Sequence, residues 1–264
     1  DGTFRESLTE QMMHTSRFSM GVDMADINND GWSEVISLDM LPDDPYILKT
    51  SLGEDGFNIF RFKIGYGYHH QFARNNLQLN NGDGPFSEIA MYAGVYATDW
   101  SWASLFLDFD HDGWKDLFIS NGIPRRMNDI DYVNFRLGDP DIQWKTDNNH
   151  IKKQELAIVE KMPQVKIPNK LLRNNGNLTF SDMAGRIRNN LPSYSNGAAY
   201  ADLDNDGDLD VVVNNIGDAP FLYQNLTMDR DSAKGNYLTF TLKGAPRNTM
   251  AIGARVIVQK ESTL

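Results

Sequence analysis

Cysteine is absent from this chain of 264 residues, so a disulfide scaffold and thiol chemistry are excluded. No apolar run approaches the ~18 residues that a membrane-spanning helix needs, so we expect no membrane span in this chain. Basic residues are outnumbered, with 25 Lys and Arg against 36 Asp and Glu, and the formal net charge is −11. Because nucleic-acid phosphates require a basic surface, we expect no nucleic-acid partner.

The common catalytic motifs are also missing. The sequence contains no GxSxG, no HExxH, no phosphate-binding loop and no dinucleotide fingerprint. Carboxylates are plentiful, and two of them could form an acid–base pair for glycoside chemistry. The sequence therefore leaves an enzyme that acts on polysaccharides open beside a non-catalytic binding role.

Aspartate occurs in excess, and it follows one repeated pattern. The stretch YADLDNDGDLDVVV, which begins at Tyr200, places five aspartates within nine residues. A single acidic run is most often a solvated surface loop. The same template, D.[DN].DG..[DE] followed by apolar residues, recurs in ADINNDGWSEVI from Ala25 and in LDFDHDGWKDLF from Leu107. Three copies of one spacing indicate a bound cation that neutralises the carboxylates.

We number each loop from its first aspartate and call residues 26–34, 108–116 and 202–210 the first, second and third loop. Side-chain oxygens stand at positions 1, 3, 5 and 9, glycine stands at position 6, and position 7 would add a backbone carbonyl. Ca²⁺ takes six to eight oxygen ligands in a flexible geometry, whereas Mg²⁺ prefers a stricter octahedron, so we expect about three Ca²⁺ ions. The predicted ligands are Asp26, Asn28, Asp30, Trp32 and Glu34; Asp108, Asp110, Asp112, Trp114 and Asp116; and Asp202, Asp204, Asp206, Asp208 and Asp210.

The segments after these loops distinguish them from EF-hand loops. An EF-hand needs a bidentate Glu at position 12, where this chain has Ser37, Ile119 and Val213. The segments EVISL, DLFIS and DVVVN, which begin at position 9, are short and rich in β-branched or aromatic residues. Such segments favour strands over helices, so we expect loops that connect strands.

The repeat extends beyond the loops. Each first aspartate stands 22 positions after a phenylalanine, in the pairs Phe4 and Asp26, Phe86 and Asp108, and Phe180 and Asp202. A serine precedes each loop at a fixed distance, and a small residue follows it at Gly21, Ala103 and Gly197. A small residue at a fixed place predicts close backbone approach in an inner strand. Units of this kind, which cannot bury their apolar face alone, are typical of β-propellers or related repeat arrays.

Three stretches resemble the FG-GAP or VCBS repeats of calcium-loaded β-propellers: NNLQLNNGDGPFSEIA, LFLDFDHDGWKDLFISNG and YADLDNDGDLDVVVNN. The resemblance implies an all-β fold with about three propeller blades over residues 1–228. A propeller usually needs at least four blades, so we expect a fragment of a larger propeller. The first loop departs from the family with Asn28 and Glu34, where Asp is usual, so we expect a weaker first site.

The tail of the sequence has a resemblance of its own. The stretch NYLTFTLKGAPRNTMAIGARVIV is similar to the start of the ASPIC/UnbV domain, which follows such repeats in bacterial secreted proteins and in cartilage acidic protein-like proteins. This similarity implies that residues 236–264 begin a second, truncated β domain.

Two inserts interrupt the repeats, near residues 42–74 and 123–168. The first contains the aromatic and glycine-rich run FRFKIGYGYHHQF, which we expect to be irregular. The second has apolar residues at helical spacing, Ile151, Leu156 and Val159, and a proline after Met162. This pattern predicts one short helix. Such inserts would lie on one face of a propeller, where repeat proteins commonly place their binding loops.

The function implied by these features is a non-catalytic, calcium-binding propeller module for adhesion or ligand binding, with a protein or a glycan as partner. Millimolar calcium outside the cell suits such loops, so we expect an extracellular, periplasmic or cell-surface location. The alternative is a polysaccharide lyase or dehydratase, because the resemblance implies that some of these enzymes use similar calcium propellers.

Overall fold

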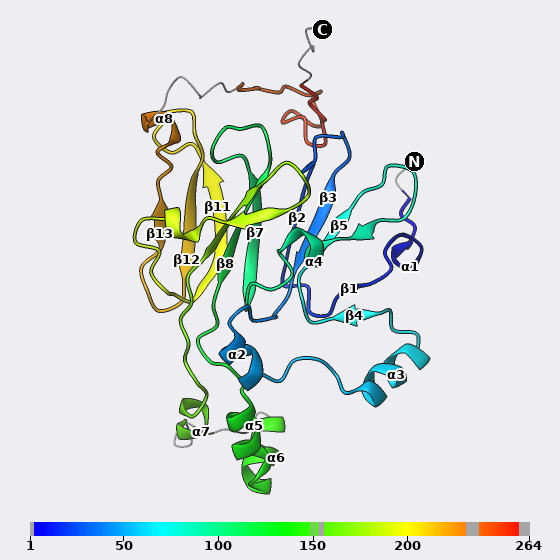
Figure 1. Cartoon of the computed structure of the whole chain (residues 1–264), viewed down its shortest axis with the longest axis vertical. Helices are drawn as coiled ribbons and strands as arrows, with labels where there is room; N and C mark the ends of the chain where they lie inside the picture. Colours follow the sequence, from blue (N-terminus) through cyan, green and yellow to red (C-terminus); the bar gives the residue numbers. More distant parts are fainter. Residues whose placement is uncertain (1–2, 149, 151, 153–155, 231–237, 259–264) are drawn as a thin grey trace.

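Within the described residues, three antiparallel sheets follow one another along the chain and repeat one strand order (Figure 1). This computed structural model describes residues 3–148, 150, 152, 156–230 and 238–258. The first sheet runs β2 (Gly21–Ala25), β3 (Glu34–Leu38), β5 (Asn76–Leu79) and β6 (Ser87–Glu88). The second sheet runs β7 (Ser101–Leu107), β8 (Asp116–Asn121), β9 (Lys170–Asn174) and β10 (Phe180–Asp182). The third sheet runs β11 (Ser195–Ala201), β12 (Asp210–Asn215) and β13 (Phe221–Tyr223).

Each acidic loop connects the first two strands of its sheet. The strands pair in the same register at the base of each loop, with Ala25 opposite Glu34, Leu107 opposite Asp116 and Ala201 opposite Asp210. The segments EVISL, DLFIS and DVVVN lie in β3, β8 and β12. The prediction of loops between strands is therefore confirmed, and the described chain is mostly β.

The second sheet lies between the other two and is buried on both faces. Its first strand, β7, contacts both β2 and β11. Successive strand residues point to opposite faces, and along β8 they enter different cores. Leu117 and Ile119 pack with residues of the first sheet, whereas Phe118 packs with Val211 and Val213 of the third sheet. Every residue of β8 is buried for this reason.

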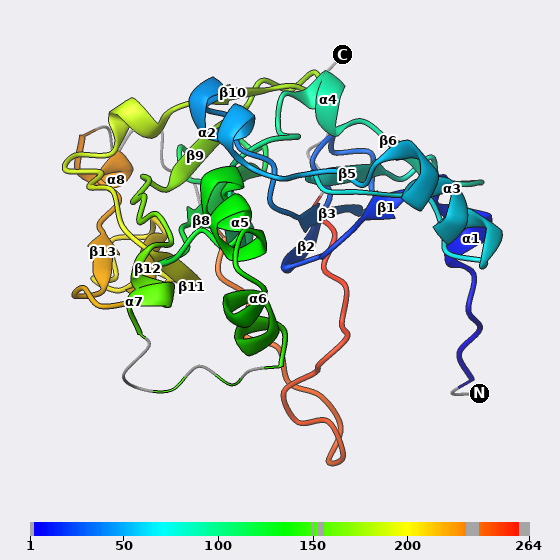
Figure 2. The same cartoon turned by 90° about the horizontal axis from the view of Figure 1, so that it is seen from below.

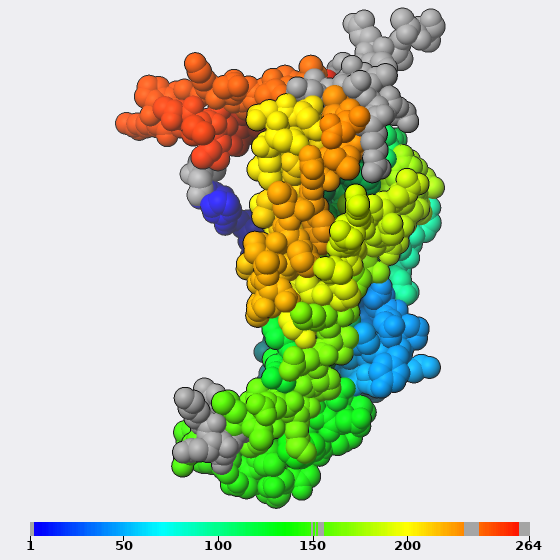
Figure 3. All heavy atoms as spheres, turned by 90° about the vertical axis from the view of Figure 1, so that its left-hand side faces the viewer, coloured from blue at the N-terminus to red at the C-terminus, as the bar shows by residue number. Residues whose placement is uncertain are grey.

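The outer faces of the first and third sheets carry exposed apolar side chains. Val22 and Met24 on β2 are exposed by 66% and 60%, and Leu222 on β13 is exposed by 63%. Figure 3 faces the side of the molecule formed by the third sheet. Within the described residues, no further sheet covers either of these faces.

The predicted close backbone approach is confirmed at one glycine. A Cβ atom at Gly21 would lie 2.0 Å from the carbonyl oxygen of Trp102, so β2 and β7 can approach only because this position lacks a side chain. The prediction is wrong at Gly197, where a Cβ would have no neighbour within 4 Å. Gly197 lies in β11 of the third sheet, and among the described residues no further sheet follows the third one to pack against β11 there.

The inserts are more helical than the sequence pattern predicts. The first insert forms α2 (Pro45–Thr50) and α3 (Phe57–Gly65), so the expectation of irregular structure is wrong there. The second forms α5 (Ile130–Leu137), α6 (Pro140–Asp147) and α7 (Ala157–Glu160) instead of one helix. Aspartates accept backbone hydrogen bonds at the start of α2, α5 and α6. Of the predicted helical residues, Leu156 and Val159 lie at α7, whereas Ile151 lies outside the described residues.

The inserts and the acidic loops lie at opposite ends of the sheets. In Figure 1, α2, α5, α6 and α7 lie below the sheets, while the loops lie above them. Figure 2 shows the molecule from below, the side on which these helices lie. Short elements complete the described chain: α1 (Leu8–Gln11), α4 (Ala90–Ala93), η2 (Ala184–Arg186), α8 (Thr227–Arg230) and a parallel pair of β1 (Thr15–Ser16) with β4 (Gln71–Phe72). Residues 238–258 contain turns but no strand, so the β domain at 236–264 stays a prediction. None of the helices described is both long and apolar enough to cross a membrane.

Candidate metal centre

The three acidic loops share one backbone conformation. Position 4 adopts a left-handed conformation in each loop, with φ values of 58°, 56° and 61° at Asn29, His111 and Asn205. The glycine at position 6 has φ values of 91°, 91° and 100° at Gly31, Gly113 and Gly207. Only glycine adopts the second conformation at low cost, which explains its place in the template. The chain thereby turns twice within six residues and brings positions 1, 3 and 5 together.

Backbone N–H groups hold the carboxylates at positions 1 and 5. The first aspartate of each loop accepts a hydrogen bond from the glycine N–H at position 6, at 2.8, 3.0 and 3.2 Å. The aspartate at position 5 accepts one from the N–H at position 7, at 2.8, 3.0 and 3.0 Å. Each of these bonds uses one carboxylate oxygen, so it fixes the side chain and leaves the other oxygen of that carboxylate available to a cation.

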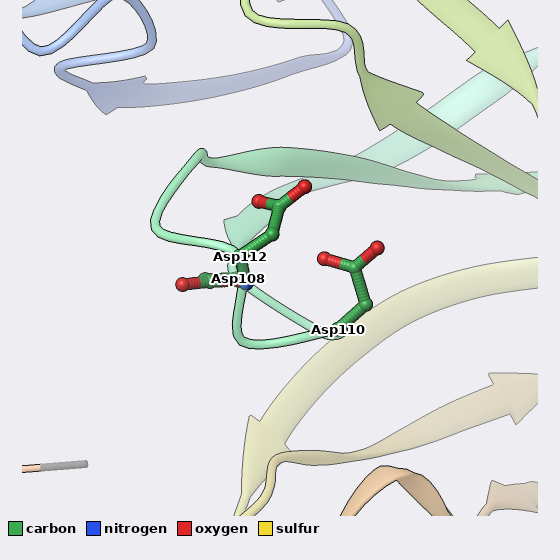
Figure 4. Close-up of side chains that lie close together, drawn as sticks. All are labelled: Asp108, Asp110 and Asp112. Atoms are coloured by element: carbon green, nitrogen blue, oxygen red, sulfur yellow. The ribbon is translucent and has the colours of Figure 1, made fainter. Parts of the chain in front are cut away.

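The carboxylates converge in the second and third loops. Asp108, Asp110 and Asp112 each place one oxygen within 4.8 Å of the others, and Asp202, Asp204 and Asp206 do the same. Figure 4 shows the three side chains of the second loop. Within the described chain, these are the groups of three acidic, His or Cys side chains that could hold a metal ion.

The first loop has an asparagine at position 3, so it offers two carboxylates at positions 1, 3 and 5 where the other loops offer three. The Nδ2 atom of Asn28 donates a hydrogen bond to the Asp30 Oδ2 atom at 2.9 Å, so position 3 turns a donor toward its neighbour. The same asparagine accepts a bond from the Asp30 N–H at 3.2 Å. The prediction of a weaker first site stays a prediction.

The acidic residues at position 9 are buried and brace the loops. Glu34, Asp116 and Asp210 are at most 2% exposed. Each accepts a bond from the N–H at position 2 of its own loop, at 2.8, 3.3 and 3.2 Å. Each also accepts one from an asparagine N–H at or just after the end of the third strand of its sheet, at 3.4, 2.8 and 2.8 Å. They stand outside the two groups of three, so their role as ligands stays a prediction.

Burial makes the position 9 carboxylate of the second loop hard to ionise. It raises the pKa of Asp116 to about 7, and the nearby charges of Asp110 and Asp112 act in the same direction, against the Asn174 N–H. Burial also raises the pKa of Asp108. A cation beside these groups would favour their charged forms.

Position 7 differs between the loops. Trp32 and Trp114 pack against the glycine of the turn after the third strand, since a Cβ at Gly82 or Gly176 would lie 2.9 or 3.1 Å from the indole ring. In the third loop the residue is Asp208, which is fully buried and accepts a bond from the Met228 N–H at 3.0 Å. The backbone carbonyls at position 7 of the three loops stay predicted ligands.

Several buried carboxylate oxygens have no hydrogen-bond donor, which is the arrangement that a cation would satisfy. They are the Oδ1 atom of Asp110, the Oδ2 atom of Asp206 and the Oδ1 atom of Asp208. Burial raises the pKa of Asp208, and the carboxylate of Asp206 acts in the same direction. The available donors are all hard oxygens, so the second and third loops fit a hard divalent cation.

Asparagines that sequence reasoning missed connect the loops across the sheets. The Asn174 Nδ2 atom donates to the Ile27 carbonyl of the first loop at 2.8 Å, while its N–H bonds Asp116 of the second loop. The Asn225 Nδ2 atom likewise donates to the Phe109 carbonyl of the second loop at 2.7 Å. The repeated asparagine before the turn was visible in the sequence, but its partner in the previous repeat was not.

Comparison with known families agrees with this geometry. Residues 66–119 and 138–213 match the FG-GAP-like repeat family, and the two segments contain the second and third loops. The first loop and the tail from residue 236 lie outside the matched segments, so the ASPIC/UnbV resemblance stays a prediction. No curated protein matches the chain in sequence. The chain therefore carries FG-GAP-like repeats.

Proposed function

We propose that the chain is a calcium-binding module in which the second and third loops each hold one Ca²⁺ ion and the first loop holds a third more weakly. The observation that carries this proposal is the convergence of three aspartate oxygens within 4.8 Å in each of the two stronger loops. Like charges this close repel one another, and a bound cation would relieve that repulsion. Calcium fits better than magnesium because the donors are clustered carboxylates on a turning backbone.

We infer that the three sheets are blades of a β-propeller. Their shared strand order and the contacts of β7 with β2 and β11 support this arrangement. In a propeller, each blade packs face to face with its neighbours, as the second sheet does with the other two. The exposed apolar faces around Val22 and Leu222 would be the surfaces that meet further blades.

The module binds a protein or glycan outside the cytoplasm in this proposal, where free calcium is high enough to fill the loops. The insert helices at the other end of the sheets would supply the binding surface. In α3 and just after it, Phe57, Phe62 and Tyr66 are exposed by 71%, 63% and 73%. Exposed aromatic side chains of this kind are common in binding surfaces.

Isothermal calorimetry tests the calcium sites directly. Asp110→Asn and Asp204→Asn keep the side-chain shape and remove one charge each, so each variant should lose one tight site from the stoichiometry. Asp131→Asn, an exposed carboxylate in α5 at the other end of the molecule, should bind calcium like the unmodified chain. Magnesium should give weaker heat at the same sites. Unchanged stoichiometry in both loop variants would contradict the proposal.

A glycan and protein array tests the binding surface separately. Phe57→Ser combined with Phe62→Ser should abolish the array signal while calcium stoichiometry stays unchanged. A signal that survives the double change would place the partner elsewhere. Under this proposal we also expect no turnover of polysaccharides, and a lyase activity lost in a point variant of this chain would favour the enzyme alternative.

A further inference from the structure

An arginine lies directly on the carboxylates of the second loop. Arg173 is in β9, and its Nε atom donates to the Asp110 Oδ2 atom at 2.7 Å while its Nη2 atom donates to the Asp112 Oδ2 atom at 2.7 Å. Both carboxylates belong to the group of three that would bind the ion. The arginine side chain is 40% exposed, and the two aspartate side chains are 27% and 25% exposed. A positive charge is thus already placed where the loop needs one.

The other two loops have a different residue at this place. Arg173 directly precedes Asn174, whose N–H donates to the position 9 carboxylate of the second loop. Asn225 and Asn80 do the same in the third and first loops, and the residues before them are Gln224 and Leu79. Gln224 reaches the same ligand position, because its Nε2 atom donates to the Asp204 Oδ2 atom at 2.9 Å. The two loops share this geometry but not the charge. The chain therefore offers a matched comparison between a charged and a neutral donor.

We propose that Arg173 is a built-in competitor of calcium at the second loop, which makes this site weaker than the third. The inference rests on the proposed calcium function. A Ca²⁺ ion that binds Asp110 and Asp112 must either displace the guanidinium from them or bind beside its positive charge. Both events reduce the gain from binding, because like charges repel and the two ion pairs are weakened or lost. The third loop also has one carboxylate more, at Asp208, and no cation on its aspartates among the described contacts.

The competition has a thermodynamic signature that separates it from a merely structural role. Without calcium, Arg173 neutralises part of the repulsion between the aspartates, so its loss destabilises the calcium-free protein. With calcium bound, the ion supplies that neutralisation and the loss of Arg173 matters less. By linkage, a group that stabilises the calcium-free form more than the bound form lowers calcium affinity.

The opposite role makes the opposite prediction. If Arg173 organised the carboxylates for calcium, its loss would weaken binding and would destabilise the bound form more than the free form. A residue that only supports the fold would lower both stabilities equally and leave affinity unchanged. These three cases can be distinguished by one set of variants.

The experiment compares three variants. Arg173→Gln gives the second loop the residue of the third loop, and Arg173→Lys keeps the positive charge. Gln224→Arg gives the third loop an arginine. All are made in the full chain. Terbium luminescence excited through tryptophan reports the second loop when Trp32 is replaced by Phe in all variants, because Trp32 and Trp114 stand at position 7 of the first and second loops. Calcium affinity at the second loop is obtained from displacement of terbium. Calorimetry reports the heat from all the loops, the third included, and melting temperatures are measured with calcium and with chelator.

We expect Arg173→Gln to tighten calcium binding at the second loop by about two- to fivefold, the size of partly exposed ion pairs. Its melting temperature should fall more in chelator than in calcium. Arg173→Lys should stay close to the unmodified chain, and Gln224→Arg should weaken the third loop. Unchanged or weaker binding in Arg173→Gln would overturn the inference but leave the calcium sites standing. No calcium binding by any variant, nor by the unmodified chain, would overturn the proposed function and this inference together.

Discussion

Asn174→Ala should be among the most costly polar substitutions in the chain. Its side chain is 2% exposed and makes three hydrogen bonds: Nδ2 donates to the Ile27 and Lys115 carbonyls at 2.8 and 3.0 Å, and Oδ1 accepts from the Gly176 N–H at 2.9 Å. At about 1 kcal/mol for each bond, the substitution should reduce the free energy of unfolding by about 3 kcal/mol. The carbonyl of Ile27, whose residue is 1% exposed, would be left without this donor.

The neighbouring residue provides a matched control. Asn175 is exposed, and its side chain bonds Thr179 and Ser181 in the same β9–β10 hairpin, so Asn175→Ala should cost less than about 1 kcal/mol. Urea unfolding in chelator measures both variants without a contribution from calcium. A loss of about 3 kcal/mol corresponds to a melting temperature lower by about 6–12 °C for a chain of this size. Equal costs for the two variants would refute the view that Asn174 joins the first and second loops.

Three further predictions concern calcium, pH and packing. In saturating calcium, Asp204→Ala should lower the melting temperature more than Asn28→Ala, because it removes a charged group from the third loop, whereas Asn28 is neutral. Equal effects would count against this difference. Although burial raises the pKa of Glu88, hydrogen bonds from Arg74 and the Ala90 N–H outweigh it and hold this pKa below 4.5. The ionised Glu88 therefore stabilises the fold fully above pH 4.5, and this stabilisation is lost as pH falls through the lowered pKa. Glu88→Gln should make the free energy of unfolding depend less on pH in this acid range. Identical pH dependence in the variant and the unmodified chain would contradict this role of Glu88. Gly122→Ala should destabilise the protein by at least about 2 kcal/mol in urea unfolding, since φ is 134° and a Cβ would lie 2.6 Å from the Tyr194 Cα atom. An unchanged free energy of unfolding would mean that the end of β8 can move away from Tyr194.

The acidic loops and the strands after them were predictable because their signal is local. The glycine at position 6 and the alternating oxygens identify the turn, and the β-branched residues that come next identify the strand. The count of about three repeats comes from the same pattern. The structure adds that Asn28 turns its amide nitrogen toward Asp30. The asparagine was visible in the sequence, but the orientation of its amide was not.

The contacts between repeats were not predictable from one sequence. Asn174 and Ile27 are 147 residues apart, and nothing local connects them. Arg173 reaches the second loop only because β9 lies beside β8 in the sheet. The insert helices were missed for a different reason. Their starts depend on single aspartates, such as Asp129 and Asp139, whose capping role is hard to separate from an ordinary acidic loop.

The calcium sites are tested most directly by a melting curve in calcium and in chelator, recorded together with metal analysis of the chain. We predict that calcium raises the melting temperature, and that at least two ions are found per chain, one lost in Asp110→Asn and one in Asp204→Asn. Stabilisation should obey mass action, at about 2.7 kcal/mol when free calcium is 100 times the dissociation constant. A melting curve that chelator leaves unmoved, with no metal on the chain, would show that the aspartates form solvated surface loops.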